Sequence, residues 1–574
     1  MALLKKVDKA AKPLKIVSRG GSGGTVSALR PAQVQKLAPC MDECPAGNDV
    51  RGWLNTISQH TKVGKSLDDA LDEAFRQLVA KNPLPAVLGR VCPHPCESEC
   101  NRKDKDSAVA INSVERFLGD WGIERRLALR AEAAPGSLPE KVAVIGSGPA
   151  GLSCAYHLAR RGYRVTVFES LPEAGGMLRY GIPDYRLPRE VLAAEVARIA
   201  ALGVEIRCGA GVGKDVPFDS LQKDFDAIFI AIGAHAGKQI KVEGEEGPSV
   251  YTGTGFLRQV AMGQPPPIGR KVAVIGGGDT AIDAARVCLR LPTDAADVAK
   301  KMGADVTLFY RRTRTEMPAI EDEVVGALEE NVTIEFLAAP SKIVRDGSGK
   351  VTRLVVERMK LGDPDASGRR SPVPTGELLE YDCDTVITAV SQEPDFRSLG
   401  GSLAGIRWLE ADKWGKTAHP KVWTGGDNIN LGLATIAIGQ GRTAADSIHA
   451  TLRGEALGEP PPQPKIPVSR LKLDFYEAKP RTQRGALAPA ERLANPAAEI
   501  DLGITKEQVL EEASRCMSCG FCFGCERCWM YCTPSCFTKV AEKAPGTYFK
   551  IKLDTCDGCK KCADECPCGF LDMA

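Results

Sequence analysis

The chain has 574 residues, enough for three or four domains that each bury a core of their own. Its 75 Lys and Arg residues nearly balance 73 Asp and Glu residues, so no global field favours nucleic acid or an anionic membrane. No segment approaches about 18 consecutive apolar residues, and we therefore expect no membrane span.

The cysteine content points to metal rather than to disulfides. Disulfides would be expected if 21 cysteines occurred in a small secreted chain, but this chain is long and its first residues lack the apolar core of an export signal. Clustered C-x-x-C spacings in such a chain favour metal binding. We expect a reduced, cytoplasmic protein that carries metal.

The N-terminal part divides into a tail and a helical domain. Residues 1–30 are basic and contain Gly and Ser, which is typical of a flexible tail. Residues 31–134 are predicted to be mostly helical and to hold two groups of cysteines. These are Cys40 and Cys44 in "APCMDECPAGND", and Cys92, Cys96 and Cys100 in "GRVCPHPCESEC".

Residues 140–170 predict a strand, a glycine turn, a helix and a second strand. Gly146, Gly148 and Gly151, with Ala150 among them, lie between the first strand and the helix, so a pyrophosphate can bind at the helix N-terminus. Glu169 ends the second strand, where a carboxylate accepts ribose hydroxyls and rejects a 2′-phosphate. This unit predicts a site for the adenosine of FAD or NAD; a glycine turn without phosphate is the alternative.

A second unit of the same kind begins at residue 270. Gly276 and Gly278 are followed by the helix-opening residues Asp279, Thr280 and Ala281. The next strand ends in Tyr310, Arg311 and Arg312 instead of an acid. Arginine at this position usually grips the 2′-phosphate of NADP, so NADPH is favoured over NADH. Solvated surface arginines are the alternative.

A third segment supports a flavin. In "VWTGGDNIN", Asp427 follows a strand and two glycines, which suits a ribityl or phosphate contact. The helix that begins near Ala434 and Thr435 could direct its N-terminal amides at the flavin ring. We therefore predict an α/β fold with two Rossmann-like domains. The FAD domain comprises residues 135–265 and 422–455, and the NAD(P)H domain, residues 266–421, is inserted into it.

Beyond these domains the chain changes character. Residues 456–505 are proline-rich near "EPPPQPKIP" and are predicted to be a linker. Residues 506–574 contain two runs of C-x₂-C-x₂-C-x₃-C spacing, typical of a two-cluster ferredoxin in which the fourth cysteine of each run ligates the other cluster. One cluster would take Cys522, Cys525, Cys528 and Cys566, and the other Cys532, Cys556, Cys559 and Cys562. A zinc ribbon is the alternative.

Two cysteines at the head of the first run, Cys516 and Cys519, have no place in this scheme. The five N-terminal cysteines are likewise too few for two clusters of four ligands, and these two raise the count to seven. Cys154, Cys208, Cys288 and Cys383 are scattered and are predicted to be buried structural thiols.

Six separated motifs occur in the order found in the small subunit of glutamate synthase and its relatives. They are the N-terminal cysteine pattern, "GSGPAGL", "GGMLRYGIPDYRLPREVL", "GGGDTAIDAARV", "YRRTRTEMPA" and "TGGDN". The resemblance covers residues 35–455 and implies an N-terminal domain with two [4Fe-4S] clusters. It also implies that Gly176 and Arg179, in the third motif, contact a cofactor.

The chain departs from that family by lacking a C-x-x-C before Cys40, and "EEASRCMSCG" resembles the missing element. The resemblance implies one cluster held by Cys40, Cys100, Cys516 and Cys519. The other would use Cys44, Cys92 and Cys96, with Glu115 in "VAINSVERF" as a fourth ligand. A plain surface carboxylate at position 115 is the alternative, and the shared cluster could also join two chains in a homodimer.

These features predict an NAD(P)H:acceptor oxidoreductase with FAD and four [4Fe-4S] clusters. Hydride would pass between nicotinamide and flavin, and single electrons between flavin and clusters. The ferredoxin tail resembles iron–sulfur flavoproteins associated with dissimilatory sulfite reductase, which implies that reductase as the protein partner. A glutamate synthase small subunit, the NAD(P)H module of a 2-oxoacid oxidoreductase, and a scaffold without turnover are the alternatives.

Overall fold

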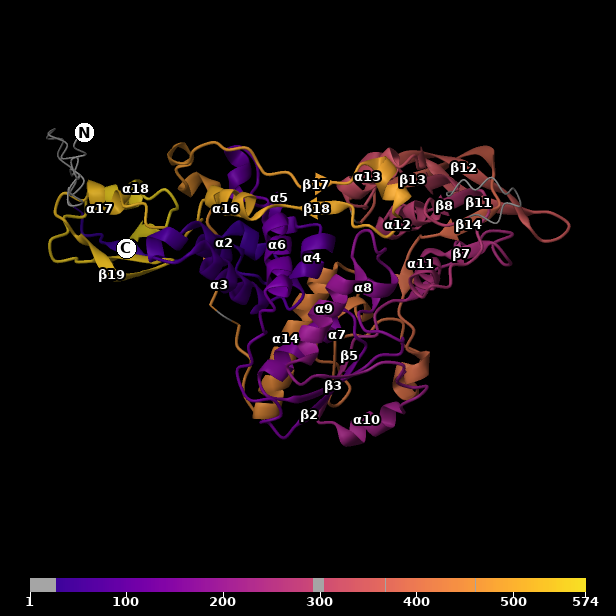
Figure 1. The fold of residues 1–574 in the computed structure, drawn as a ribbon, viewed down its shortest axis with the longest axis horizontal. Helices are drawn as coiled ribbons and strands as arrows, with labels where there is room; N and C mark the ends of the chain where they lie inside the picture. The colour runs from indigo at the N-terminus through magenta and orange to yellow at the C-terminus, as the bar shows by residue number, and fades with distance from the viewer. Residues whose placement is uncertain (1–26, 293–303, 367, 460) are drawn as a thin grey trace, which may run out of the picture.

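The computed structural model describes residues 27–292, 304–366, 368–459 and 461–574. Most of the predicted tail, residues 1–26, lies outside the described residues. Figure 1 shows an elongated molecule with the C-terminal module at one end, the second nucleotide-binding unit at the other, and the helical domain between them. The first nucleotide-binding unit lies beneath the helical domain in this view.

The first nucleotide-binding unit is a parallel five-stranded sheet of order β16-β5-β2-β3-β4. Its central strands are almost continuously apolar and buried, as expected where helices cover a parallel sheet. On one face α7 packs against α14. The elements are β2 (Lys141–Ile145), α7 (Pro149–Arg160), β3 (Arg164–Phe168), α8 (Met177–Tyr180), α9 (Arg189–Ala200), β4 (Glu205–Arg207), α10 (Phe218–Asp224), β5 (Ala227–Ile230), β16 (Val422–Thr424) and α14 (Ala434–Arg453).

The second unit repeats this design with strand order β10-β9-β8-β14-β7. The chain leaves the first sheet after β5 and returns at β16, which confirms the predicted insertion of one Rossmann-like unit in the other. The second sheet begins earlier than the predicted division at residue 266, because β7 is its edge strand. The elements are β7 (Val250–Thr252), α11 (Gly253–Ala261), β8 (Lys271–Ile275), α12 (Asp279–Cys288), β9 (Asp305–Tyr310), α13 (Glu321–Glu329), β10 (Thr333–Phe336) and β14 (Thr385–Thr388).

Two small antiparallel sheets accompany the second unit. One is a three-stranded meander of β11 (Ala338–Arg345), β12 (Val351–Pro364) and β13 (Arg370–Asp382). The other pairs β6 (Ala236–Gly237) with β15 (Gln392–Glu393), in the two segments that connect the units. The pairing of β6 with β15 holds the two connecting segments together.

The helical domain packs a C-terminal helix into its core. α16 (Lys506–Arg515) lies against α2 and α6, and its Val509 and Ala513 are fully buried there. The predicted ferredoxin domain, residues 506–574, therefore does not begin its own fold at residue 506; α16 belongs to the helical core. The other helices are α1 (Pro39–Asp42), α2 (Val50–Ser58), α3 (Leu67–Val79), α4 (Pro85–Val91), α5 (Pro95–Ser98) and α6 (Ile111–Glu124).

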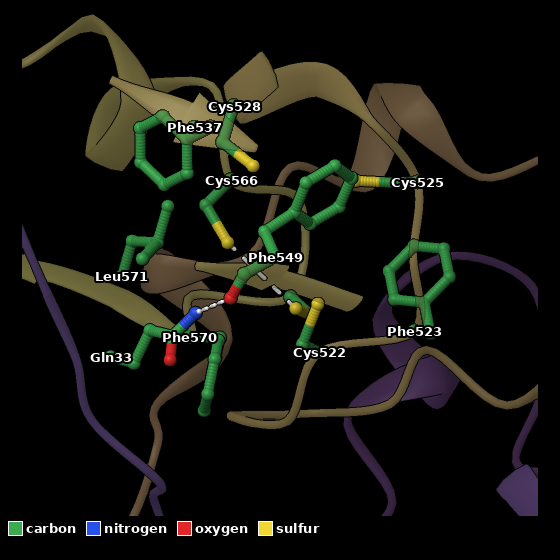
Figure 2. A pocket seen from close by; sticks show the side chains of 11 residues that line it. Gln33, Cys522, Phe523, Cys525, Cys528, Phe537, Phe549, Cys566, Phe570 and Leu571 are labelled. Carbon is green, nitrogen blue, oxygen red and sulfur yellow. Dashed lines mark hydrogen bonds between the residues drawn. The ribbon is translucent and has the colours of Figure 1, made fainter. Parts of the chain in front are cut away.

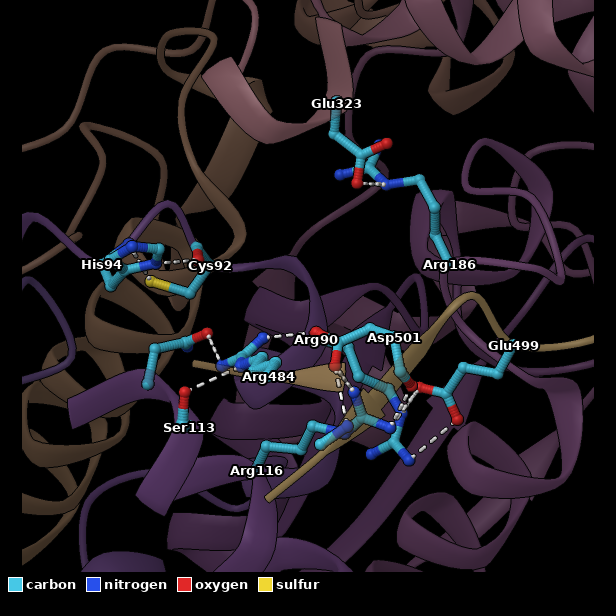
Figure 3. Close-up of polar contacts among 12 residues, drawn as sticks. Arg90, Cys92, His94, Ser113, Arg116, Arg186, Glu323, Arg484, Glu499 and Asp501 are labelled. Carbon is cyan, nitrogen blue, oxygen red and sulfur yellow. Dashed lines mark hydrogen bonds and ion pairs between the residues drawn. The ribbon is translucent and has the colours of Figure 1, made fainter. Parts of the chain in front are cut away.

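The segment predicted as a linker is an ordered arm fixed to two domains. It forms a two-stranded sheet of β17 (Gly485–Ala486) and β18 (Asp501–Gly503), with α15 (Pro489–Ala494) between them. Figure 3 shows Glu499 of the arm beside Arg90 and Arg116 of the helical domain. At its far end Arg492 lies 2.8 Å from Glu329 on α13, so the arm reaches the second nucleotide-binding unit.

The C-terminal module contains a strand from the other end of the chain. β1 (Pro31–Gln33) pairs antiparallel with β21 (Leu571–Met573), so residues 31–33 join this module rather than the helical domain. A hairpin of β19 (Phe537–Ala544) and β20 (Thr547–Ile551) and two short helices, α17 (Arg527–Tyr531) and α18 (Lys561–Asp564), complete it. Within the described ranges no helix combines the length and apolar character needed to cross a membrane.

Candidate functional site

The glycine turn between β2 and α7 forms an open cradle. Gly146 has φ +100°, and a Cβ on it would be 2.3 Å from the Ala231 carbonyl oxygen. A Cβ on Gly151 would be 2.0 Å from the Gly146 carbonyl oxygen. Gly148 has no atom within 4 Å of its Cβ position, so the space at the helix N-terminus can accept a phosphate.

Glu169, directly after β3, is tied to this turn. Its Oε2 accepts hydrogen bonds from Ser147 N at 3.0 Å and Ser147 Oγ at 2.5 Å, and its Oε1 accepts one from Leu171 N at 2.8 Å. On the other side a Cβ on Gly176 would be 2.7 Å from Gly148 Cα. Glu169 and Gly176 therefore flank the cradle, as a site for an adenosine requires.

Two nitrogens of Arg179 on α8 bind within the loop that precedes the helix. Its Nε donates to the Ala174 carbonyl oxygen at 2.8 Å, and its Nη1 lies 2.8 Å from Glu173 Oε2. The side chain is buried and holds the loop of Gly176 in place. A direct contact between Arg179 and a cofactor stays a prediction.

The end of β16 brings the flavin segment to the same cradle. Gly426 has φ +69°, and a Cβ on it would be 3.1 Å from Ala150 Cβ. Asp427 follows, accepts a hydrogen bond from Gly432 N at 3.0 Å, and has its pKa raised to about 6 by burial. No side chain caps α14 at Ala434, so the N–H groups of its first turn can serve a ligand.

The second glycine turn forms a matching cradle between β8 and α12. Gly276 has φ +151°, and a Cβ on it would be 2.4 Å from the Ala389 carbonyl oxygen, whereas the Cβ position of Gly278 is open. Asp279 Oδ1 accepts a hydrogen bond from Ile320 N at 2.9 Å and so braces the neighbouring loop. The other predicted residues of this turn, Thr280 and Ala281, follow in the first turn of α12.

The two arginines after β9 have different surroundings. Arg312 is buried, and it donates from Nη2 to Asp365 Oδ2 at 2.6 Å and from Nε to the Arg370 carbonyl oxygen at 2.7 Å. Arg311 is exposed and has no hydrogen-bond or ion-pair partner within the described ranges. Arg311 is therefore free to bind a 2′-phosphate. Arg312 instead binds the three-stranded meander formed by β11, β12 and β13.

A buried latch joins the two nucleotide-binding units. Arg186, from the loop before α9, has its Nη1 2.7 Å from Asp283 Oδ2 in the second unit. Its Nε lies 2.9 Å from Oε1 of Glu323, also in the second unit (Figure 3). The Tyr185 ring packs against Arg290, whose guanidinium carbon is 4.2 Å from the ring centroid. Tyr185 and Arg186 belong to the motif "GGMLRYGIPDYRLPREVL", which was predicted only to contact a cofactor. Its role in joining the two nucleotide-binding units was not predicted.

The sixteen predicted cluster ligands line four separate cavities, four ligands at each, with 300, 330, 360 and 380 Å³ of atom-free space. A [4Fe-4S] cluster needs four ligands. We name each cavity by one cysteine. The Cys44 cavity is lined by Cys44, Cys92, Cys96 and Glu115, and the Cys40 cavity by Cys40, Cys100, Cys516 and Cys519. The Cys522 cavity is lined by Cys522, Cys525, Cys528 and Cys566, and the Cys532 cavity by Cys532, Cys556, Cys559 and Cys562.

The Cys44 cavity adjoins the flavin segment, because Thr435 of α14 lines it. Glu115 is not a surface carboxylate: it is buried, and its Oε1 accepts a hydrogen bond from Asn82 Nδ2 at 2.9 Å. Burial raises the pKa of Glu115 to about 7. Coordination to an iron ion at this cavity would stabilise its ionised form.

The Cys40 cavity joins the two ends of a single chain. Burial, followed by the neighbouring thiols of Cys100, Cys516 and Cys519, raises the pKa of Cys40 well above its usual range. The end of α16 at Arg515 places Cys516 there, and α16 is itself fixed in the helical core. The cavity is thus complete within one chain, without a second protomer.

The two cavities of the C-terminal module each contain one cysteine that spacing did not identify. Cys568 lines the Cys522 cavity with its Sγ 3.8 Å from Cys566 Sγ, and the hydrogen bond between the two sulfurs lowers the pKa of Cys566. Cys536 lines the Cys532 cavity. Figure 2 shows the sulfur atoms of Cys522, Cys528 and Cys566 turned toward one another among phenylalanine rings.

Amide groups already donate to several predicted ligands. His94 N donates to Cys92 Sγ at 3.3 Å, Ser518 N to Cys516 Sγ at 3.4 Å, and Cys536 N to Cys532 Sγ at 3.2 Å. Such N–H···S contacts stabilise thiolates that bind a cluster. No three His, Cys, Asp or Glu side chains among the described residues are arranged for a single metal ion. The residues fit clusters at these cavities. Of the four scattered cysteines, Cys154, Cys288 and Cys383 are buried as predicted, but the prediction was wrong for Cys208, which is exposed directly after β4.

Comparison with known proteins agrees with this geometry. Residues 140–441 match the pyridine nucleotide-disulphide oxidoreductase family, and residues 25–127 match the 4Fe-4S domain II of dihydropyrimidine dehydrogenase. The chain is 37% identical over 541 residues to NADPH-Fe(3+) oxidoreductase subunit beta of Geobacter sulfurreducens, covering 85% of this chain and 77% of that protein.

Two further relatives have similar coverage. NADP(+)-dependent formate dehydrogenase subunit beta of Moorella thermoacetica is 38% identical, over 84% of this chain and 70% of that protein. The glutamate synthase [NADPH] small chain of Escherichia coli is 33% identical, over 78% of this chain and 97% of that protein. The chain therefore belongs to the pyridine nucleotide-disulphide oxidoreductase family, among NADPH-dependent oxidoreductases like the glutamate synthase small chain that use FAD, NADP and [4Fe-4S] clusters.

Proposed function

We propose that this protein passes electrons between NADPH and a protein partner through one FAD and four [4Fe-4S] clusters, all held by one chain. A flavin exchanges hydride with a nicotinamide and single electrons with clusters, so it connects the two kinds of carrier. The residues of the chain bind these groups, set their distances and exclude water from them.

The observation that carries the proposal is the sequence of the four cavities. Thr435 connects the flavin segment to the Cys44 cavity, and Ile111 lines both the Cys44 and the Cys40 cavity. Cys519 of the Cys40 cavity and Cys522 of the next are three positions apart, and Phe537 lines both cavities of the C-terminal module. These shared and adjacent residues support one route from the flavin to the end of the module.

The two nucleotide sites are held in fixed relation by residues outside the cradles. Arg186 binds Asp283 and Glu323 across the units, and removing one partner of such a buried pair is costly. The arm adds a second connection, since Ile500 N donates to the Tyr185 carbonyl oxygen at 3.0 Å. In this proposal both contacts keep the nicotinamide and flavin sites facing each other.

The partner that the C-terminal module favours is dissimilatory sulfite reductase. The proposal rests on the resemblance of the ferredoxin tail to flavoproteins associated with that enzyme. The Cys532 cavity would be the exit, because it is the last of the series and Cys559 beside it is partly exposed. In an organism that oxidises sulfur the electrons would flow toward NADP.

A subunit of another reductase is the second candidate. The relatives in Geobacter and Moorella are named as beta subunits, and the Escherichia coli relative as a small chain. A role like that of a glutamate synthase small subunit, or of the NAD(P)H module of a 2-oxoacid oxidoreductase, would use the same flavin site. The ferredoxin-like tail argues against an ordinary glutamate synthase subunit.

Purification from the native source under anaerobic conditions tests the proposal. NADPH should bleach the flavin of the isolated chain, and dissimilatory sulfite reductase should co-purify and become reduced when NADPH is added. Co-purification of a glutamate synthase large subunit or a formate dehydrogenase would refute the sulfite reductase assignment. Failure of NADPH to bleach the flavin would refute the oxidoreductase role itself.

A further inference from the structure

α2 runs between two of the cluster cavities and presents different residues to each. Asn48 just before the helix, with Val50 and Trp53, lines the Cys44 cavity. Arg51 and Leu54 line the Cys40 cavity. One short helix therefore forms a wall of both.

Trp53 has a buried N–H group without a partner. Its side chain is 1% exposed, and Nε1 finds no hydrogen-bond acceptor among the residues that the structure describes. An indole N–H can act only as a donor. An orphaned buried donor is rare and calls for an occupant that accepts its hydrogen bond.

Arg51 has the same feature on the other face of the helix. The residue is 2% exposed, and its Nε has no hydrogen-bond partner in the described part of the chain. The guanidinium is held through its Nη1, which donates to the Lys36 carbonyl oxygen at 2.6 Å and to the Cys519 carbonyl oxygen at 2.5 Å. The Phe521 ring centroid lies 4.9 Å from Cζ. The unpaired Nε–H is therefore held rigidly at the wall of the Cys40 cavity.

We infer that Trp53 Nε1 and Arg51 Nε donate hydrogen bonds to the sulfur atoms of the clusters in the Cys44 and Cys40 cavities, and so set their reduction potentials. This rests on the proposed presence of clusters there. A cluster gains negative charge on reduction, so a donated hydrogen bond stabilises the reduced form and raises the potential. Arg51 adds a full positive charge, whereas Trp53 is neutral.

The two donors on α2 differ in charge and therefore affect the two clusters differently. The cluster beside the flavin segment receives a neutral donor, and the next cluster receives a charged donor. Arg51 should therefore raise the reduction potential of the Cys40 cluster more than Trp53 raises that of the Cys44 cluster. Trp53 and Arg51 are positioning residues that together favour the electron on the Cys40 cluster over the Cys44 cluster.

Redox titration of the intact holoprotein, followed by EPR spectroscopy, tests this inference. Trp53→Phe keeps a ring and removes only the N–H, so one component should shift to lower potential. Arg51→Gln should shift a different component to lower potential, and further than Trp53→Phe shifts its own. Trp121→Phe is a matched control, because Trp121 Nε1 already donates to Asp72 Oδ1 at 2.9 Å; it should shift none.

Iron content is measured on each variant so that a lost cluster is not mistaken for a shifted one. If Trp53→Phe loses iron, incorporation of a benzothiophene analogue of tryptophan at position 53 preserves the volume of the ring system and still removes the N–H. Unchanged potentials in fully loaded variants, or a shift of the same component by both, would overturn the inference. In either case NADPH bleaching of the flavin separates this failure from failure of the proposed function.

Discussion

Replacement of Arg311 by alanine should weaken the use of NADPH and leave the use of NADH nearly unchanged. Arg311 is exposed and unpaired within the described ranges, directly after β9, and β9 pairs with β8, the strand that precedes the open cradle at Gly278. A charge-assisted hydrogen bond to a 2′-phosphate contributes about 1.5–3 kcal/mol. Since about 1.4 kcal/mol corresponds to a factor of ten, kcat/KM for NADPH should fall roughly 10- to 150-fold.

Arg312→Ala is the matched comparison, because its guanidinium is already bound to Asp365 and to the Arg370 carbonyl oxygen. This change should lower the free energy of unfolding by about 1–3 kcal/mol without changing the ratio of the two nucleotides. Anaerobic stopped-flow bleaching of the flavin with NADPH and with NADH measures both effects. Equal losses with both nucleotides in Arg311→Ala would refute the assignment of Arg311 to the phosphate.

Three further predictions concern metal, ligand and pH. The holoprotein should contain about 16 irons and one FAD with no zinc, and metal analysis near eight irons would refute four clusters. Glu115→Ala should alter the EPR signal of one cluster, because its cavity would keep only three protein ligands; an unchanged spectrum would refute ligation. Asp427→Asn should stabilise the cofactor-free protein at pH 7 by at most about 3 kcal/mol, but should not stabilise it at pH 4. Burial raises the pKa of Asp427 to about 6, so the free energy of unfolding of the wild-type protein falls as the pH rises from 4 to 7. Urea unfolding at both pH values measures this, and an equal gain at pH 4 would contradict it.

The parts of the site that depend on local chain geometry were predictable from sequence. A glycine turn between a strand and a helix must form a cradle, so Gly146, Gly148 and Gly278 occupy the expected places. The spacing of Cys522, Cys525 and Cys528 likewise brings them to one cavity, because two intervening residues allow neighbouring thiols to face one centre.

Contacts between distant segments were predictable only where one segment had too few cysteines to complete its clusters. The junction of Cys40 with Cys516 followed from the resemblance and from a shortage of N-terminal cysteines, and the structure brings these residues together. The pairing of β1 with β21 and the burial of α16 in the helical core had no such signal, since three-residue strands and an amphipathic helix fit many partners.

Donors that serve a cavity from its wall were also missed. Trp53 and Arg51 lie in an ordinary amphipathic helix, and nothing in that pattern separates an orphaned N–H from a core tryptophan or a surface arginine. Cys536 and Cys568 lie outside the ferredoxin spacing, although the sequence "CPCGF" could have drawn attention to Cys568. Only the arrangement of side chains in space reveals these roles.

The iron content of the Cys516→Ser, Cys519→Ser double variant tests the central claim most directly. These two residues supply half of the ligands of the Cys40 cavity and none of any other. The account predicts about 12 irons per chain instead of about 16, with one FAD and NADPH bleaching retained. About 16 irons would show that the two cysteines are not ligands, and about eight would show that they belong to both clusters of the C-terminal module.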